Sequence, residues 1–165
     1  MAGSRTELIG IYLNDHLAGA TAGTELAHRV ARSHDEVADR ATLQRLAGEI
    51  NADRRALLEI MALLGVPVRH YKTTAAWLGE RAGRLKFNGR LRTRSPLSGL
   101  EELELLRLGV EGKAAGWRTL RELAGAGAEP RLSEAWLDEL LTRARAQGDL
   151  LEDLRVRAAR HLLEA

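Results

Sequence analysis

The chain has 165 residues, enough for one domain with a substantial apolar core. It contains no Cys, which excludes disulfides, thiolate metal sites and cysteine nucleophiles. The formal net charge of only +2 argues against polyanion binding by the whole surface. No secretory signal pattern and no long uncharged apolar run are present in the sequence, so we expect a cytoplasmic protein that does not enter a membrane.

Three prolines and 4% aromatic residues in a Leu- and Ala-rich chain predict an all-α fold. Four segments carry apolar residues at steps of three and four, the pattern of a helical bundle. In the fourth segment this stripe is expected to extend from Leu137 to His161. We predict one domain over residues 1–165, with helices over residues 5–32, 34–64, 97–124 and 133–163.

Capping signals mark the ends of these helices. Ser4, Ser33 and Ser98 are each followed three residues later by Glu, which is the capping box, and Ser133 is a further N-cap. Gly65 is a stop signal. The connections within the first pair and within the second pair of helices are short, which predicts two antiparallel hairpins.

The connection between the two hairpins, residues 65–96, is far longer than a tight turn needs and can run the length of the bundle. Apolar residues at helical spacing between Thr73 and Leu85 predict a short helix within it.

This connection also concentrates positive charge. From Arg69 to Arg94 there are eight Lys or Arg residues against one acid, a local charge of +7, whereas the remainder carries −5. Such a segment can bind phosphates or nucleic acid, or its basic residues can pair with acids on neighbouring helices. We favour internal pairing over nucleic-acid binding. The candidate anion-binding residues are Arg84, Lys86, Arg90, Arg92 and Arg94.

A polar residue interrupts the apolar stripe of each predicted helix. Counted from the helix ends, these four residues lie within about 5 Å of one another along the bundle axis. Two further acids stand in the same height range. The predicted polar core layer consists of His16, Glu49, Asp53, Glu111, Lys113 and Gln147.

Three stretches carry a family resemblance: YLNDHLAGATAG (Tyr12–Gly23), GRLKFNGR (Gly83–Arg90) and RSPLSGLEELELLRLGVEGK (Arg94–Lys113). With these stretches the chain resembles the ferritin-like superfamily, in particular a bacterial branch without an assigned activity. The resemblance implies a four-helix bundle of two antiparallel hairpins joined by one long crossover. It supports the fold far more than a function.

Ferritin-like di-metal centres use a Glu on each of two helices and Glu-x-x-His on each of the others. This chain departs from that pattern, because Ala52 lies three residues after Glu49 and Leu150 lies three residues after Gln147. Moreover, Lys113 occupies the core seam, where its ammonium replaces the charge of a metal and repels a cation. The preferred interpretation is a non-enzymatic bundle without a cofactor. Its degenerate metal centre is replaced by a buried polar network, and it acts through binding or assembly.

Alternatives remain open from the sequence. A weak site of His16, Glu49, Asp53 and Glu111 would hold Fe or Mn, as in a metal-dependent oxidoreductase or a storage protein. A small-ligand or proton-handling pocket near Lys113 is another interpretation. The amphipathic helices are also compatible with a homodimer.

Overall fold

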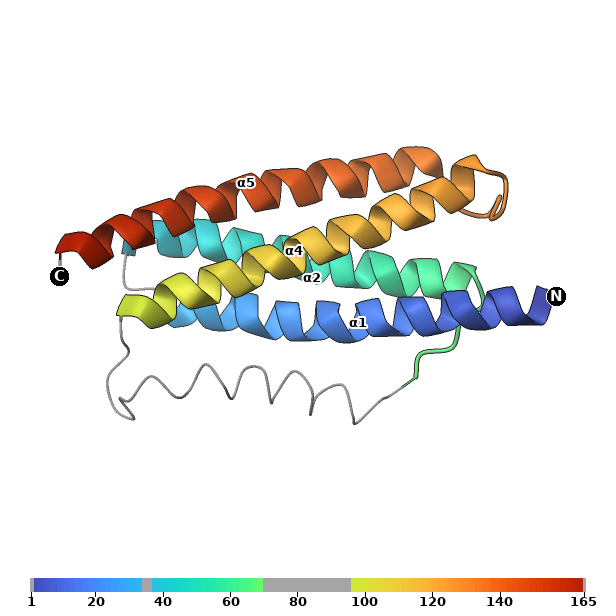
Figure 1. Cartoon of the computed structure of the whole chain (residues 1–165), viewed down its shortest axis with the longest axis horizontal. Coiled ribbons are helices and arrows are strands. Elements are labelled where there is room, and N and C mark those ends of the chain that lie inside the picture. The colour runs from blue at the N-terminus through green and yellow to red at the C-terminus, as the bar shows by residue number, and fades with distance from the viewer. Residues whose placement is uncertain (1, 34–36, 70–95, 165) are drawn as a thin grey trace.

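A computed structural model of the chain describes residues 2–33, 37–69 and 96–164. These residues form four α-helices (Figure 1): α1 (Ala2–Ser33), α2 (Val37–Leu63), α4 (Pro96–Gly125) and α5 (Glu134–Glu164). The predicted all-α four-helix bundle is confirmed, and the helix bounds lie within three residues of the predicted ones. Within the described ranges, no helix is apolar enough over its length to cross a membrane.

The four helices lie side by side as two hairpins, α1 with α2 and α4 with α5 (Figure 1). The two hairpins meet where α1 packs against α4. In Figure 1, α2 and α4 run in the same direction, so the end of α2 and the start of α4 lie at opposite ends of the bundle. The predicted short helix between Thr73 and Leu85 lies outside the described residues.

Two glycines and one serine mark helix ends, whereas Ser33, predicted as an N-cap, is the last residue of α1 and its hydroxyl donates to the Arg29 carbonyl at 2.8 Å. Gly65, with φ +69°, and Gly127, with φ +64°, follow α2 and α4 in the left-handed conformation that favours glycine. The hydroxyl of Ser133 accepts a hydrogen bond from the Trp136 amide at 3.3 Å, which confirms it as the N-cap of α5. Ser4 and Ser98, by contrast, lie inside helices that begin two residues earlier. Capping boxes predict such boundaries only to within a few residues.

The bundle contains two apolar clusters. One lies around Leu13, Ile60, Trp117 and Leu137, near the ends of α2 and α4. The other lies around Val30, Leu43, Leu103 and Leu154, near the starts of the same two helices. The boundary falls between Ile50 and Ala56 on α2, between Val110 and Ala114 on α4, and between Ala144 and Leu151 on α5.

The predicted polar residues Asp53, Lys113 and Gln147 lie in these three gaps and separate the two apolar clusters. The predicted core stripe of α5 ends earlier than expected, because Leu154 is buried whereas His161 is exposed. Ala158, one turn after Leu154, is partly buried and packs against the second apolar cluster.

A buried amide attaches the end of the first hairpin to α1. The side-chain amide of Asn14 donates to the carbonyl of Pro67 at 3.1 Å and to that of Gly10 at 2.8 Å. Its oxygen accepts from the backbone N–H of Arg69 at 2.7 Å. The chain is thus held against α1 as it leaves α2.

Candidate functional site

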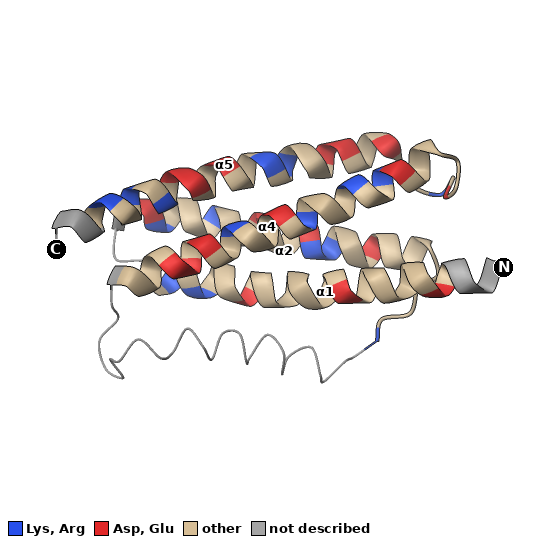
Figure 2. Ribbon diagram, in the orientation of Figure 1, with Lys and Arg blue, Asp and Glu red and all other residues tan. Residues whose placement is uncertain are grey.

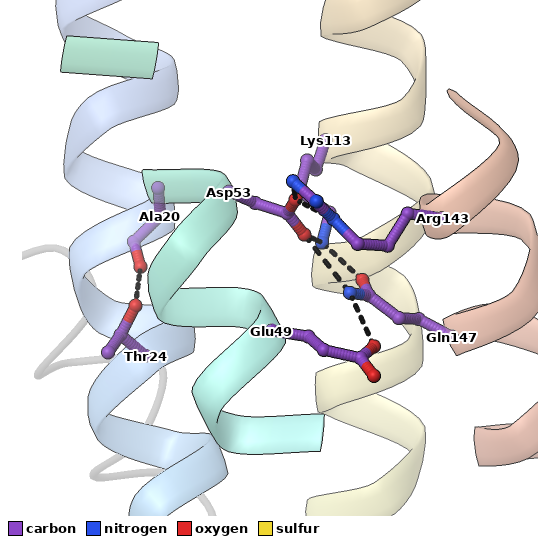
Figure 3. A network of polar contacts seen from close by, with 7 residues as sticks. All are labelled: Ala20, Thr24, Glu49, Asp53, Lys113, Arg143 and Gln147. Atoms are coloured by element: carbon purple, nitrogen blue, oxygen red, sulfur yellow. Dashed lines mark hydrogen bonds and ion pairs between the residues drawn. The ribbon is translucent and has the colours of Figure 1, made fainter. Parts of the chain in front are cut away.

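The polar layer is centred on the carboxylate of Asp53, which is almost completely buried. One carboxylate oxygen accepts from the Lys113 ammonium on α4 at 2.5 Å, and the other accepts from Nε of Arg143 on α5 at 2.7 Å. A second Arg143 nitrogen, Nη2, also contacts that oxygen. One anion on α2 thus joins cations from both helices of the other hairpin (Figure 3). Such charge-assisted bonds are stronger than those between neutral groups.

Gln147, also buried, completes the layer from α5. Its carbonyl oxygen accepts from the Lys113 ammonium at 2.5 Å. Its amide nitrogen donates to Asp53 at 3.1 Å and to Glu49 at 3.2 Å. Both ends of the Gln147 amide are therefore hydrogen-bonded, as a buried amide requires. Glu49 itself is an exposed residue, so the layer reaches solvent through it.

Lys113 has an environment unusual for its residue type, because its side chain is only 13% exposed. Burial lowers the pKa of Lys113, because desolvation disfavours the charged form, while the Asp53 carboxylate opposes this shift. The neighbouring Arg143 guanidinium lowers the pKa further. Two cations thus share one buried carboxylate, each bonded to a different oxygen.

On the side of α1, the gap between the apolar clusters contains hydroxyl groups. Thr21 accepts from Nε of Arg54 on α2 at 3.0 Å and donates to the Leu17 carbonyl at 2.9 Å. One turn away, the Thr24 hydroxyl donates to the Ala20 carbonyl at 2.8 Å (Figure 3). α1 thus satisfies its own polar groups at this height, and a hydrogen bond to Arg54 joins it to α2.

His16 lies at the predicted height, where its contacts are with α4 and with Tyr12. Its ring packs against Gly116 of α4, where an added Cβ would come within 3.0 Å of the imidazole. Its centroid is 4.5 Å from that of the Tyr12 ring, and the Tyr12 hydroxyl donates to Thr119 at 3.1 Å. His16 therefore belongs to the α1–α4 contact. The stripe of α1 that carries His16 packs against both α2 and α4, and the His16 ring lies on the α4 side.

Glu111 also lies outside the layer. Its side chain is 71% exposed and pairs with Arg118 at 2.7 Å. Two residues before Lys113 on a helix, Glu111 points about 200° away from it. Its position along the bundle axis predicted a place near the layer, but its position around the helix directs its side chain to solvent.

Arg143, one helical turn before Gln147, was not predicted as a member of the layer. The sequence feature that could have indicated it is a basic residue that flanks the apolar stripe of the helix, one turn from Gln147. Long side chains at such flanking positions can bring their charge inward while their stems cover apolar surface.

The alternative metal ligands are not brought together. Asp53 and Glu49 both contact the layer, but His16 and Glu111 lie elsewhere. Across residues 2–33, 37–69 and 96–164, no three His, Cys, Asp or Glu side chains form a group that could hold a metal ion. The candidate anion-binding residues, from Arg84 to Arg94, lie outside the described residues.

Comparison with known proteins adds no relative. No family model matches the chain, and no curated protein or solved structure is significantly similar to it. The site must therefore be interpreted from its own chemistry.

Proposed function

We propose that this chain is a non-enzymatic, ferritin-like bundle in which the Lys113 ammonium takes the position of a metal ion. The protein then acts through binding or assembly. The observation that supports this best is the placement of the Lys113 ammonium, 2.5 Å from both Asp53 and Gln147 at the boundary between the two apolar clusters. In a ferritin-like bundle, the inward-facing side chains at this depth would be metal ligands.

Electrostatics supports the same interpretation. Asp53 already accepts from the two cations Lys113 and Arg143. A divalent ion at the same carboxylate would lie a few ångströms from both, and like charges at that distance repel strongly in a buried environment. Displacing Lys113 would also leave the Gln147 carbonyl without its donor.

The chain directions are consistent with the ferritin-like type. α2 and α4 run the same way, and each hairpin is antiparallel (Figure 1). A bundle of this kind needs one long crossover between its second and third long helices. The 32 residues from 65 to 96 are sufficient for that connection.

Cation replacement in a lysine deletion tests the proposal. In Lys113→Ala, we expect Mn(II) or methylammonium to raise the melting temperature, because each cation can enter the space beside Asp53. The wild type should show no such rise, because its own ammonium fills that space. Lys113→Met, in which an apolar chain of similar length fills the space, is the matched control and should not respond.

Two results would contradict the proposal. Stoichiometric Fe or Mn in the wild-type protein after incubation with Fe(II) and Mn(II) would favour the metal-dependent oxidoreductase or storage role instead. Equal stabilisation of Lys113→Ala and Lys113→Met by added cations would show that they act elsewhere on the protein.

A further inference from the structure

The exposed large hydrophobic side chains of the described residues gather on α1 and α4. Leu108 on α4 is 68% exposed, and α5 contributes none among the residues described. Outside these two helices, only Leu63 at the end of α2 and Val68 beyond it are similarly exposed. The members on α1 and α4 are Leu8, Ile11, Leu97, Leu105 and Leu108. Leu97, Leu105 and Leu108 share one face of α4, because steps of eight and three residues bring side chains to the same side of a helix, and an exposed apolar stripe of this kind is typical of an interface.

Gly19, Gly23, Gly109 and Gly112 leave open space at their missing side chains, and we call this open space the hollow. Antiparallel packing of α1 and α4, counted from the His16–Gly116 contact, brings Gly19 level with Gly112 and Gly23 level with Gly109. An added Cβ at any of these four positions would meet nothing within 4 Å. Gly116 is required by the close approach of His16, but packing among residues 2–33, 37–69 and 96–164 gives no reason for the other four. Each weakens its helix relative to Ala.

We propose that a second copy of this chain docks on this surface, with the two α4 helices packed antiparallel about a two-fold axis. The two-fold axis passes midway between Leu108 and Gly112 of α4. Leu108 of each copy then packs into the hollow at Gly112 of the other copy. A protrusion and a hollow on the same face are self-complementary, as a two-fold contact requires. The absence of side chains at Gly109 and Gly112 lets the two backbones approach closely.

Charge complementarity favours a second copy as the occupant. The first half of α4 carries the acids Glu101 and Glu104, and its second half carries Arg118. The antiparallel arrangement places Arg118 of one copy between Glu101 and Glu104 of the other. Among the described residues, Arg118 pairs with Glu111 and Glu104 pairs with Arg155 at 3.7 Å, both in exposed contacts of the kind that contribute little to stability. The middle of α1, between Asp15 and Glu25, carries no charge that opposes the contact (Figure 2).

This inference goes beyond the proposed function and does not depend on the ion-pair layer. Analytical ultracentrifugation over a range of protein concentrations tests it. We expect the wild type to form a dimer, and we expect Leu108→Glu to weaken it at least about tenfold, because a buried anchor is lost. The matched control is Leu63→Glu, an exposed leucine at the end of α2, which should leave the dimer unchanged.

Gly112→Leu gives a second test with opposite readouts. Filling the hollow should weaken the dimer, yet raise the melting temperature of the monomer because leucine favours the helix. Gly48→Leu, on α2 with nothing within 4 Å of an added Cβ, should raise the melting temperature and leave the dimer intact.

The remaining outcomes overturn the proposal. If the wild type is monomeric at all concentrations, the proposal is wrong, whatever the effect of Leu108→Glu on the melting temperature. If that variant is destabilised, another segment of the same chain covers the leucines. If it is unchanged, the surface is left for a different protein. A dimer that survives both Leu108→Glu and Gly112→Leu uses another face.

Discussion

Lys113 and Asp53 are bonded across the bundle at 2.5 Å, although one lies on α4 and the other on α2, helices that belong to different hairpins. The bond therefore fixes the height of one hairpin against the other. Apolar side chains pack in many registers, whereas a buried ion pair is satisfied in only one. Polar residues in coiled-coil seams specify register in the same way.

Removal of the Asp53 carboxylate is expected to be costly. Asp53→Ala leaves Lys113 without its buried anion and removes the inner partner of Arg143, so we expect a loss of roughly 3–5 kcal/mol in the free energy of unfolding. Urea denaturation measures this loss. Glu49→Ala is the control, since Glu49 is exposed and accepts only one amide hydrogen bond, at 3.2 Å. Similar unfolding curves for the two variants would contradict a central role for Asp53.

His16 is expected to make stability depend on pH. Burial lowers the pKa of His16 from its ordinary value of 6.5, and the Asp15 carboxylate opposes the shift. The unfolded chain therefore takes up this proton more readily than the folded chain. The contribution of His16 is fully present above pH 6.5 and is lost as the pH falls through the folded-state pKa.

The difference in unfolding free energy between the wild type and His16→Phe isolates this effect. Phe keeps an aromatic ring against Gly116 and Tyr12 but cannot be protonated. Relative to this variant, the wild type should lose stability as the pH falls below 6.5. Parallel profiles across that range would show that His16 does not titrate differently on folding.

Gly116→Ala should destabilise the α1–α4 contact. The added Cβ would lie 3.0 Å from Cε1 and 3.1 Å from Nδ1 of His16, so the ring must move; we expect a cost of about 1–3 kcal/mol. Gly48→Ala, where the Cβ meets open space, should instead stabilise the protein by up to about 1 kcal/mol. In a His16→Ala background the Gly116→Ala cost should disappear. A cost that persists there would point to strain elsewhere.

Asn14→Ala should loosen the attachment of the chain after α2. The substitution leaves the Pro67 carbonyl and the Arg69 amide without their Asn14 partner, so we expect a loss of about 1–3 kcal/mol in the free energy of unfolding, measured in urea. Thr24→Ala serves as the comparison, because its hydroxyl bonds only within its own helix and should matter little. An Asn14→Ala variant as stable as Thr24→Ala would contradict this role.

The sequence was sufficient to predict the bundle and three members of the polar layer. Apolar spacing placed Asp53, Lys113 and Gln147 on the inner faces of their helices, and counting residues placed them at one height. Both inferences use only the regular geometry of the helix. For these three residues, the inner face of the helix and its height together located the side chain.

Two residues predicted for the layer have their contacts elsewhere. Glu111 shares the height of Lys113 but not its face, whereas His16 lies on the apolar stripe of α1 but contacts Gly116 of α4, because that stripe packs against two neighbouring helices. Arg143 and Asn14 were missed because neither belongs to the predicted apolar stripe of its helix, although their side chains bond to Asp53 and Pro67. Which long side chain turns inward depends on the distance between neighbouring helices, which a single sequence does not encode locally.

The division of the apolar core by the Asp53 layer affects how the molecule opens. Each end of the bundle has its own apolar cluster, and transient local unfolding that starts at one terminus is expected to stop at the ion pairs rather than continue through them. Amide hydrogen exchange would then separate the two ends into units with different protection. One half of the bundle can thus unfold locally and refold while the four helices of the other half stay packed.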